Sequence, residues 1–433
     1  MEVSADDAER YDCCKTPLDL LKNPLTFPVA KNLIARNRLT KAPMMEELAT
    51  YNPKIVEKCG LPTELLFHMT QKFCAGGCGM IVTGCIESTD GLVANPGDAL
   101  IAKAIDSPER RQLFQQYAKC ANGSLIIGQI IHPGQRSTRL VDQKYVPYDM
   151  NKLTTTEIRQ VIEQHVYGAR YLYEAGFHGV ELNASLSFAL GQMVDASQNV
   201  RTDVYGGCLE NRTRIILEII KNIRDSINDD ANFIVGLKLS SPNFEEGFRE
   251  REFADFCAKL DESKLDYVVV AGGHYQYLQR ITKLGDLSRC RETFYQQFAE
   301  MARHFLKNVR VIRCGGFVTA EQIHEVLEKK WADAVGIGRA LAAEPDYITS
   351  DLANKLLNGV VLSAKQSIIP DNEFMKRKEA AGTQLWQIAT GKKLLDLTDP
   401  KHVEIFEQEL KKHEEHKKER KNTDDYGYMK LQL

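Results

Sequence analysis

Two glycine turns late in the chain carry the clearest chemical signal in the sequence. Each follows a short apolar run typical of a strand: Val309–Arg313 precedes Gly315 and Gly316, and Ala334–Ile337 precedes Gly338 and Arg339. Glycine leaves backbone N–H groups accessible, and such groups bind phosphate together with a helix N-terminus, here expected near Thr319. A glycine can also serve only to relieve backbone strain. Two such turns at neighbouring positions, with Arg339 adding charge, favour a phosphate site.

Acid–base candidates are fewer. His132, His274 and Tyr275 fall in expected loops and could donate protons, although loop histidines are more often structural or solvated. Lys238 stands at the end of an apolar run, where a lysine is as often structural as functional.

A metal centre is not expected. The eleven cysteines are scattered and form no Cys-x2-Cys pair, so their spacing predicts neither a metal site nor a disulfide framework. Reduced, mostly buried thiols are the expected state, as in cytoplasmic proteins.

The elements that position these residues alternate between short β-branched runs and amphipathic segments, which is typical of βαβ units. Eight strands are predicted: Arg38–Pro43, Met80–Thr83, Leu125–Ile131, Gly179–Asn183, Phe233–Leu239, Tyr267–Ala271, Val309–Arg313 and Ala334–Ile337. Eight strand–helix repeats close a (β/α)8 TIM barrel, whose active site lies in the loops after the strand C-termini. An open doubly wound sheet is less consistent, because no glycine-rich loop follows the first strand.

The clearest helix is predicted over residues 154–174. Ile158, Val161, Ile162 and His165 belong to one apolar stripe at helical spacing, and Thr155 or Thr156 is the expected cap. Gly176 is expected to end the helix in the left-handed conformation.

Three regions are expected along the chain: a segment over residues 1–30 that forms a lid on the closed end of the barrel, the barrel over 31–357, and a C-terminal extension over 358–433. The highly charged stretch 401–421 is predicted to form an exposed helix, with a partner surface as the alternative.

Composition narrows the class of protein. Hydrophobic residues make up 43% and charged residues 27% of the 433, so a large core is expected rather than disorder. The net charge of −3 gives no electrostatic case for nucleic acid. No apolar run is long enough to span a membrane and the N-terminus does not resemble a signal peptide, so we expect a cytoplasmic protein without membrane contact. Homo-oligomerisation stays open.

Several motifs together resemble the old yellow enzyme family, in its NADH:flavin oxidoreductase (NADH oxidase) branch. They run in the family's order over roughly residues 17–400: Asn37-Arg38 with Ala42-Pro43-Met44, Gln129 with His132 and Gly134, Gly176–Leu182, Asn199–Gly207 with Glu210–Arg212, the two glycine turns, and Leu385–Ala389.

This resemblance implies FMN bound across the barrel mouth and an NADH or NADPH donor. Carried over by position, Lys238 stands where the family usually has an arginine beside N1 of the flavin, where a cation stabilises the reduced ring. The remaining implied flavin contacts are Pro43, Met44, Met45, Cys85, Gln129, Gly315, Gly316, Gly338 and Arg339.

The substrate side departs from the family pattern. Asn183 and Leu186 replace the family's pair of substrate-gripping donors, and Phe188 replaces its proton-donating tyrosine. Asn183 keeps an amide donor, so Asn183, His132 and Tyr275 are the catalytic candidates. Ordinary enone reduction is therefore not expected.

The function predicted from the sequence is an FMN-dependent NAD(P)H oxidoreductase that passes hydride from nicotinamide to flavin and then to a small-molecule acceptor, such as a quinone, dioxygen or an activated alkene. The alternative is a catalytically decayed flavin-binding or scaffold protein, favoured by the changes at Asn183, Leu186 and Phe188 and opposed by the intact flavin features.

Overall fold

A computed structural model describes residues 9–433 except 53, 140–143, 186–187, 229, 241–249, 272–286, 346–351 and 420–424. Side chains of 250, 287–295 and 418–419 are also outside it. His274, Tyr275 and Leu186 therefore lie outside the described residues.

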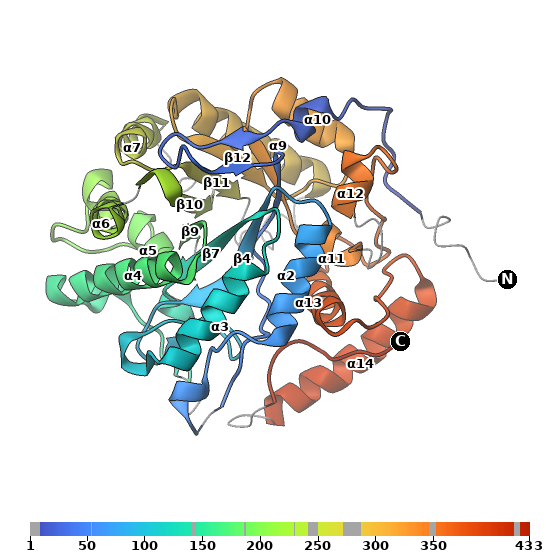
Figure 1. The fold of residues 1–433 in the computed structure, drawn as a ribbon, viewed down its shortest axis with the longest axis horizontal. Coiled ribbons are helices and arrows are strands. Elements are labelled where there is room, and N and C mark those ends of the chain that lie inside the picture. Colours follow the sequence, from blue (N-terminus) through green and yellow to red (C-terminus); the bar gives the residue numbers. More distant parts are fainter. Residues whose placement is uncertain are drawn as a thin grey trace.

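Eight parallel strands close a barrel at the centre of the molecule, with helices around them (Figure 1). They are β3 (Leu39–Lys41), β4 (Met80–Glu87), β7 (Leu125–Ile131), β9 (Gly179–Ala184), β10 (Ile234–Ser240), β11 (Tyr267–Ala271), β12 (Arg310–Cys314) and β13 (Ala334–Ile337). Neighbouring strands pair in the order β3-β13-β12-β11-β10-β9-β7-β4, and a β3–β4 pairing closes the ring. The predicted (β/α)8 TIM barrel is confirmed.

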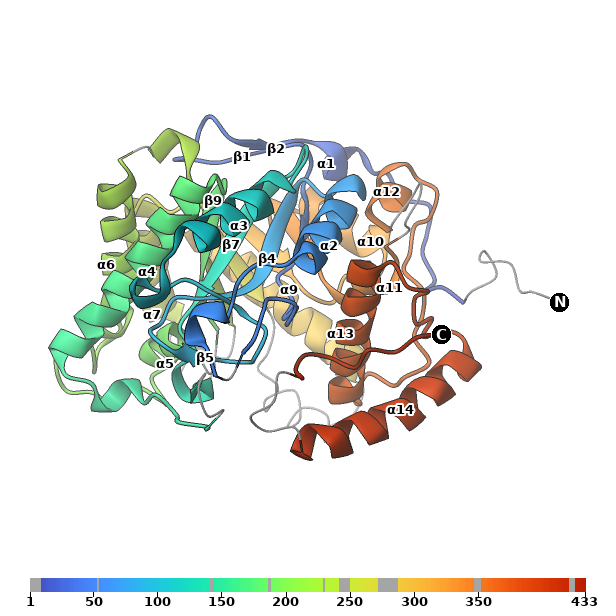
Figure 2. The same cartoon turned by 60° about the horizontal axis from the view of Figure 1, so that its bottom comes forward.

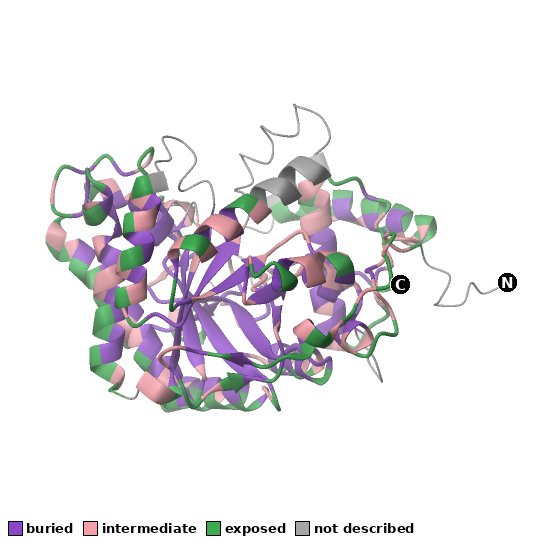
Figure 3. Ribbon diagram, turned by 90° about the horizontal axis from the view of Figure 1, so that it is seen from above, coloured by how far each residue is buried: buried purple, intermediate pink, exposed green. Residues whose placement is uncertain are grey.

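Helices surround this sheet and turn their apolar faces toward it (Figure 3). In chain order they are α2 (Glu64–Ala75), α3 (Pro108–Lys119), α4 (Thr155–Ala175), α6 (Leu209–Ile227), α7 (Glu250–Glu262), α9 (Leu287–Phe305) and α10 (Ala320–Glu328). The ring is completed by α13 (Phe374–Thr390), which packs on α2. Short helices lie at the edges: α1 (Asp19–Lys22), α5 (Ala189–Val194), α11 (Arg339–Ala343) and α12 (Leu352–Leu357).

Helix α4 shows how local sequence fixes an element. Thr154 caps it by accepting a hydrogen bond from the Glu157 N–H, and Glu157 bonds back to Thr154, which forms a capping box. The expected caps Thr155 and Thr156 are wrong, because the reciprocal glutamate stands three residues after Thr154. Gly176 ends the helix with φ of 91°, as predicted.

The closed end of the barrel is covered by a hairpin of β1 (Leu25–Thr26) and β2 (Ile34–Ala35). Leu25 and Phe27 pack onto Met80, Ile127 and other apolar side chains that point into the lower barrel. The lid is therefore present, and the hairpin runs across the expected boundary at residue 30; the three-region division stays a prediction.

Strand β4 contains a bulge between Val82 and Cys85, where its pairing with β7 shifts by one residue. Val82 points into the lower barrel, and Cys85 points inward as well, although strict alternation would turn it outward. Strand β4 also continues to Glu87, beyond its predicted end at Thr83. The bulge explains the short prediction, since it interrupts the period-two pattern.

After the barrel, α13 and α14 (Pro400–Glu419) lie side by side at one edge of the molecule (Figure 2). The expected exposed helix at 401–421 is only partly right, because Val403, Phe406 and Leu410 on α14 are buried against Ala380 of α13 and the last residues of the chain. Among the described helices, none is long and apolar enough to cross a membrane.

Candidate functional site

Inward-facing polar side chains gather where the central strands end. Strand pairing sets Cys85 beside Gln129 and Gln129 beside Glu181, one after another across β4, β7 and β9. Two residues after Glu181, toward the C-terminal end of β9, Asn183 pairs with Lys238 on β10. Five residues from four strands therefore meet at the C-terminal end of the barrel, where TIM-barrel active sites lie.

Gln129 is the centre of this group. Its Nε2 donates to Glu181 at 2.7 Å, and its Oε1 accepts from Asn183 Nδ2 at 3.1 Å. Its backbone N–H donates to Thr83 Oγ1 at 3.1 Å, which ties β7 to the bulge of β4. One N–H and one lone pair of the Gln129 amide stay available to a ligand.

Glu181 is a carboxylate inside the barrel and was missed from the sequence. It is fully buried, and its second oxygen accepts from the Tyr267 hydroxyl at 3.0 Å. Gly236 leaves the space for that tyrosine, since a Cβ there would lie 2.2 Å from the Tyr267 ring. The available signal was a charged residue in a strand otherwise buried on both faces.

Lys238 supplies the positive charge in the barrel mouth. Burial raises the pKa of Glu181, and the charge of Lys238 opposes that rise. The same ammonium group lowers the pKa values of the Cys85 and Cys314 thiols against the larger effect of burial. Leu237 and Leu239 pack toward the surrounding helices and Ile234 packs inside the barrel, so alternation along β10 turns Lys238 toward the interior.

The two glycine turns lie on adjacent strands. Cys314 at the end of β12 pairs with Gly336 on β13. Gly315 and Gly316 both have positive φ, 106° and 80°, which favours glycine and leaves these backbone groups without side chains. They lead to α10, where Thr319 and Gln322 form a capping box.

The loop after β3 carries Pro43, Met44 and Met45 toward these turns. The Ala42 N–H bonds to the carbonyl of Ile337, and Met44 lies in van der Waals range of Gly338. Arg339 begins α11, and its guanidinium lies 5.7 Å from the centre of the Phe374 ring. The predicted ring-lining and phosphate residues are thus neighbours around one side of the mouth.

Phe188 and Met45 form an apolar patch at the mouth together with Cys85, Ala94 and Ile131. Arg136 stacks on the Phe188 ring, 5.2 Å from its centre. The patch contains no hydroxyl group, so the position of Phe188 offers no proton.

His132 contacts the start of α5, since its backbone carbonyl accepts from the Ala189 N–H at 3.1 Å. Burial lowers its pKa to about 3, and its Nδ1 accepts the Gly134 N–H at 3.2 Å. A ring that stays neutral at physiological pH is a hydrogen-bonding group rather than an acid. Asn183 is also engaged, since its Oδ1 accepts from the Ser185 N–H at 2.9 Å, and it keeps one N–H.

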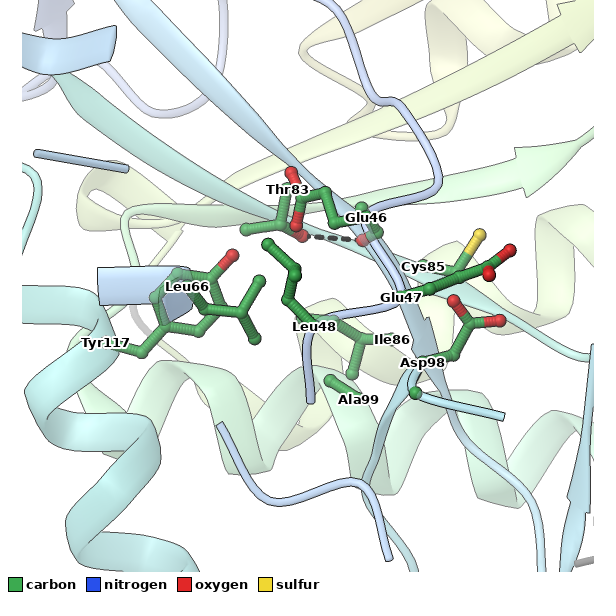
Figure 4. A pocket seen from close by; sticks show the side chains of 12 residues that line it. Glu46, Glu47, Leu48, Leu66, Thr83, Cys85, Ile86, Asp98, Ala99 and Tyr117 are labelled. Carbon is green, nitrogen blue, oxygen red and sulfur yellow. Dashed lines mark hydrogen bonds between the residues drawn. The ribbon is translucent and has the colours of Figure 1, made fainter. Parts of the chain in front are cut away.

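Beside the mouth lies a small cavity (Figure 4) lined by Leu48, Leu66, Thr83, Tyr117 and their neighbours. Glu47 and Asp98 lie next to each other on the side near Cys85. Burial, reinforced by the charge of Glu47, raises the pKa of Asp98 to about 8. Burial and the charge of Asp98 raise the pKa of Glu87 well above its usual range. Across the described residues, no group of three or more His, Cys, Asp or Glu is arranged to hold a metal ion.

Residues 23–356 match the model of the NADH:flavin oxidoreductase / NADH oxidase family. The NADH-dependent flavin oxidoreductase nadA of Aspergillus parasiticus is 29% identical over 406 residues, which cover 89% of each chain. The NADH oxidase of Thermoanaerobacter brockii is 25% identical over 331 residues, 73% of this chain and 48% of that protein.

Among solved structures, an old yellow enzyme homologue from Zymomonas mobilis superimposes with a TM-score of 0.60 at 20% identity, covering 79% of this chain and 94% of its own. That likeness supports the barrel fold. The family match spans most of the barrel, and the chain therefore belongs to the NADH:flavin oxidoreductase / NADH oxidase family, with flavin-dependent oxidoreduction as its activity.

Proposed function

We propose that the flavin is FMN, held non-covalently across the mouth of the barrel, and that the protein moves electrons from a reduced nicotinamide to a quinone or dioxygen. The observation that carries this proposal is the meeting of Cys85, Gln129, Asn183 and Lys238 at the strand ends, beside two glycine turns on adjacent strands.

The residues present fit a flavin mononucleotide. The positive φ of Gly315 and Gly316 leaves a turn open to a phosphate, with Arg339 as the nearby cation. Gln129 keeps one donor and one acceptor for the edge of a pyrimidine ring, and Cys85 is its neighbour across the β4–β7 pairing. Backbone groups of Pro43 and Met44 would line the ring from the loop after β3. Lys238 offers a cation where negative charge develops on reduction.

When bound, the flavin supplies two-electron chemistry between donor and acceptor. The chain's own part is to hold the ring, stabilise its reduced charge through Lys238, and keep the Phe188 side of the pocket apolar. Since neither Phe188 nor the neutral His132 is an acid, an acceptor that takes its protons from solvent fits the site best. A quinone or dioxygen meets that condition better than an activated alkene.

The test uses the purified full-length protein. Heat-released flavin should be FMN on chromatography, and anaerobic addition of NADH should bleach the visible absorption, with NADPH as the comparison. Arg339→Ala should weaken FMN binding by about 10- to 100-fold, because one charge-assisted phosphate bond is lost. A colourless protein that takes up no FMN, or one that binds FMN without being reduced by either nicotinamide, would contradict the proposal.

A further inference from the structure

The last residues of the chain return to the barrel mouth. We call residues 425–433 the C-terminal strap. Its Met429 and Leu431 are buried against α13 and α14, and Gln387 of α13 donates to the Leu431 carbonyl at 3.1 Å. In Figure 2 the strap runs along the inner side of α14. The strap is thus a packed element.

Two tyrosines of the strap occupy spaces that glycines leave open. The Tyr428 ring lies on Gly382 of α13, where a Cβ would come within 2.1 Å of it. The Tyr426 ring lies on Gly97, where a Cβ would come within 2.7 Å. An alanine at either glycine would displace a tyrosine.

Tyr426 binds the loop that follows β3. Its hydroxyl donates to the Ala49 carbonyl at 2.6 Å, and its ring meets that of Tyr51 edge to face at 5.6 Å. The Ala49 N–H in turn donates to the Gly97 carbonyl at 2.9 Å. One strap side chain therefore joins this loop to the segment before β6 (Ala99–Leu100).

The same loop is held in an unfavourable conformation. Glu47 has φ of 53°, which is uncommon for a residue with a side chain. Gly427 of the strap, itself at φ of 85°, lies so close that a Cβ there would be 3.1 Å from the Glu47 carbonyl. Strained backbone persists when surrounding structure holds it, and here the strap is part of that surrounding structure.

Tyr428 lies where buried carboxyl groups converge. Glu47, Glu379 and Asp98 all add to the effect of burial, which raises the pKa of Tyr428 well above its usual range. The phenol therefore stays protonated beside these acids. Lys378 lies over its ring, 5.6 Å from the centre.

We propose that the C-terminal strap positions the flavin-binding loop: Tyr428 anchors the strap on α13, Tyr426 and Gly427 hold residues 47–51, and through them the strap fixes Pro43, Met44 and Met45 against the flavin. This rests on the proposed function, because it assumes that FMN lies over those three residues. The competing interpretation is a strap that only stabilises the packing of α13 and α14.

The experiment compares four variants of the full-length protein. Tyr426→Phe removes the bond to Ala49 and keeps the ring, while Gly382→Ala displaces Tyr428 without changing it. Lys430→Ala alters an exposed strap residue whose ammonium group lies 3.6 Å from the Asp425 carboxylate, also in the strap. Ile219→Ala creates a cavity under α6, in a core cluster that contains no strap residue, as a control for lost stability.

Two quantities are measured: FMN affinity, by quenching of flavin fluorescence, and amide hydrogen exchange of residues 44–51 in the protein stripped of flavin. Tyr426→Phe and Gly382→Ala should weaken FMN binding by about 3- to 10-fold and speed exchange in the loop. Lys430→Ala should change neither, and Ile219→Ala should lower the melting temperature only.

Wild-type affinity and wild-type loop exchange in both Tyr426→Phe and Gly382→Ala would overturn the proposal, as would equal effects in Ile219→Ala. If the wild-type protein takes up no FMN, the proposed function fails and the positioning of a flavin-binding loop fails with it. If the wild-type protein binds FMN, and Tyr426→Phe and Gly382→Ala match it in FMN affinity and in loop exchange, the strap proposal alone is wrong.

Discussion

Lys238 is the side chain whose charge reaches furthest within the barrel mouth. It acts on Glu181, Cys85 and Cys314, and Glu181 partly balances it. A cation held over a ring that gains negative charge on reduction favours the reduced state. On the proposed flavin site, we expect the balance between Lys238 and Glu181 to influence the reduction potential of the bound flavin.

Lys238→Met should lower the flavin midpoint potential. Loss of one charge-assisted interaction of about 1.5–3 kcal/mol corresponds to a shift of about 30–60 mV for a two-electron couple. The potential is measured by equilibration with reference dyes, and Lys238→Arg, which keeps the charge, is the control. An unchanged potential in Lys238→Met would show that the ammonium group does not reach the flavin.

Asp98 makes stability depend on pH. Its folded pKa of about 8 lies above an ordinary unfolded value of about 4. The folded state therefore favours the protonated carboxyl, and this contribution is fully present below about pH 4 and lost as the pH rises to about 8.

Asp98→Asn should remove that dependence. Between pH 6 and pH 9 the wild-type melting temperature should fall by a few degrees more than that of the variant, and the two should converge toward low pH. Differential scanning calorimetry across this range checks the result. Parallel curves for the two proteins would mean that another group, with Glu87 the first candidate, carries the titration.

At the scale of elements, we expect the start of α5 to influence which acceptors can be reduced. Phe188 is its N-terminal flanking residue and fills the apolar patch beside Cys85 and Met45. A tyrosine there would bring a hydroxyl to the same place without changing the backbone.

We expect the reduced wild-type enzyme to be reoxidised quickly by a quinone or dioxygen and slowly by cyclohexenone. Phe188→Tyr should speed the reaction with cyclohexenone by about 100-fold or more, since general acid catalysis is worth that much, and leave quinone reduction nearly unchanged. Anaerobic stopped-flow compares both acceptors, with Phe188→Leu as the control. Rapid cyclohexenone reduction by the wild type would point to a proton donor elsewhere.

The same elements show what the sequence could and could not reveal. All eight strands were predictable, because each is a short β-branched run bounded by turn residues, and alternation then places Gln129 and Lys238 inward. The bulge at Thr83–Gly84 was not predictable from the sequence, since it reverses the alternation and turns Cys85 inward. Tyr426 and Tyr428 could not be assigned to the mouth, because their contacts to Ala49 and Gly382 join segments that no local pattern connects.

At the scale of the whole molecule, one buried ion pair joins the lid to the barrel. Asp266 before β11 is fully buried and accepts from the N–H groups of Val29, Ala30 and Val235, at 2.9, 2.9 and 3.0 Å. Asp266 also forms an ion pair with Arg224 of α6, at 2.7 Å. The N-terminal segment, a barrel strand and an outer helix thus share one carboxylate.

Asp266→Asn should destabilise the protein by about 3–5 kcal/mol, because it removes the buried, nearer carboxylate from the Arg224 guanidinium and leaves only the partly exposed Asp230, at 3.8 Å. Urea unfolding gives this difference. Asp225→Asn, which removes the charge from a largely exposed partner of Lys221, should change stability by less than about 1 kcal/mol. A small effect at Asp266 would mean that the carbonyl groups of Phe233 and Lys264, which also accept from Arg224, suffice.

The bulge of β4 restricts which deletions and substitutions this strand can tolerate. A single-codon deletion at Thr83 or Gly84 would restore strict alternation and turn Cys85 from the barrel interior toward the surrounding helices. Substitution of Gly84 by a larger residue is also unfavourable, since a Cβ there would lie 2.7 Å from the Met44 carbonyl oxygen. Length variation should therefore collect in the loops around this strand, while the spacing from Val82 to Cys85 stays fixed in any descendant that keeps the pocket.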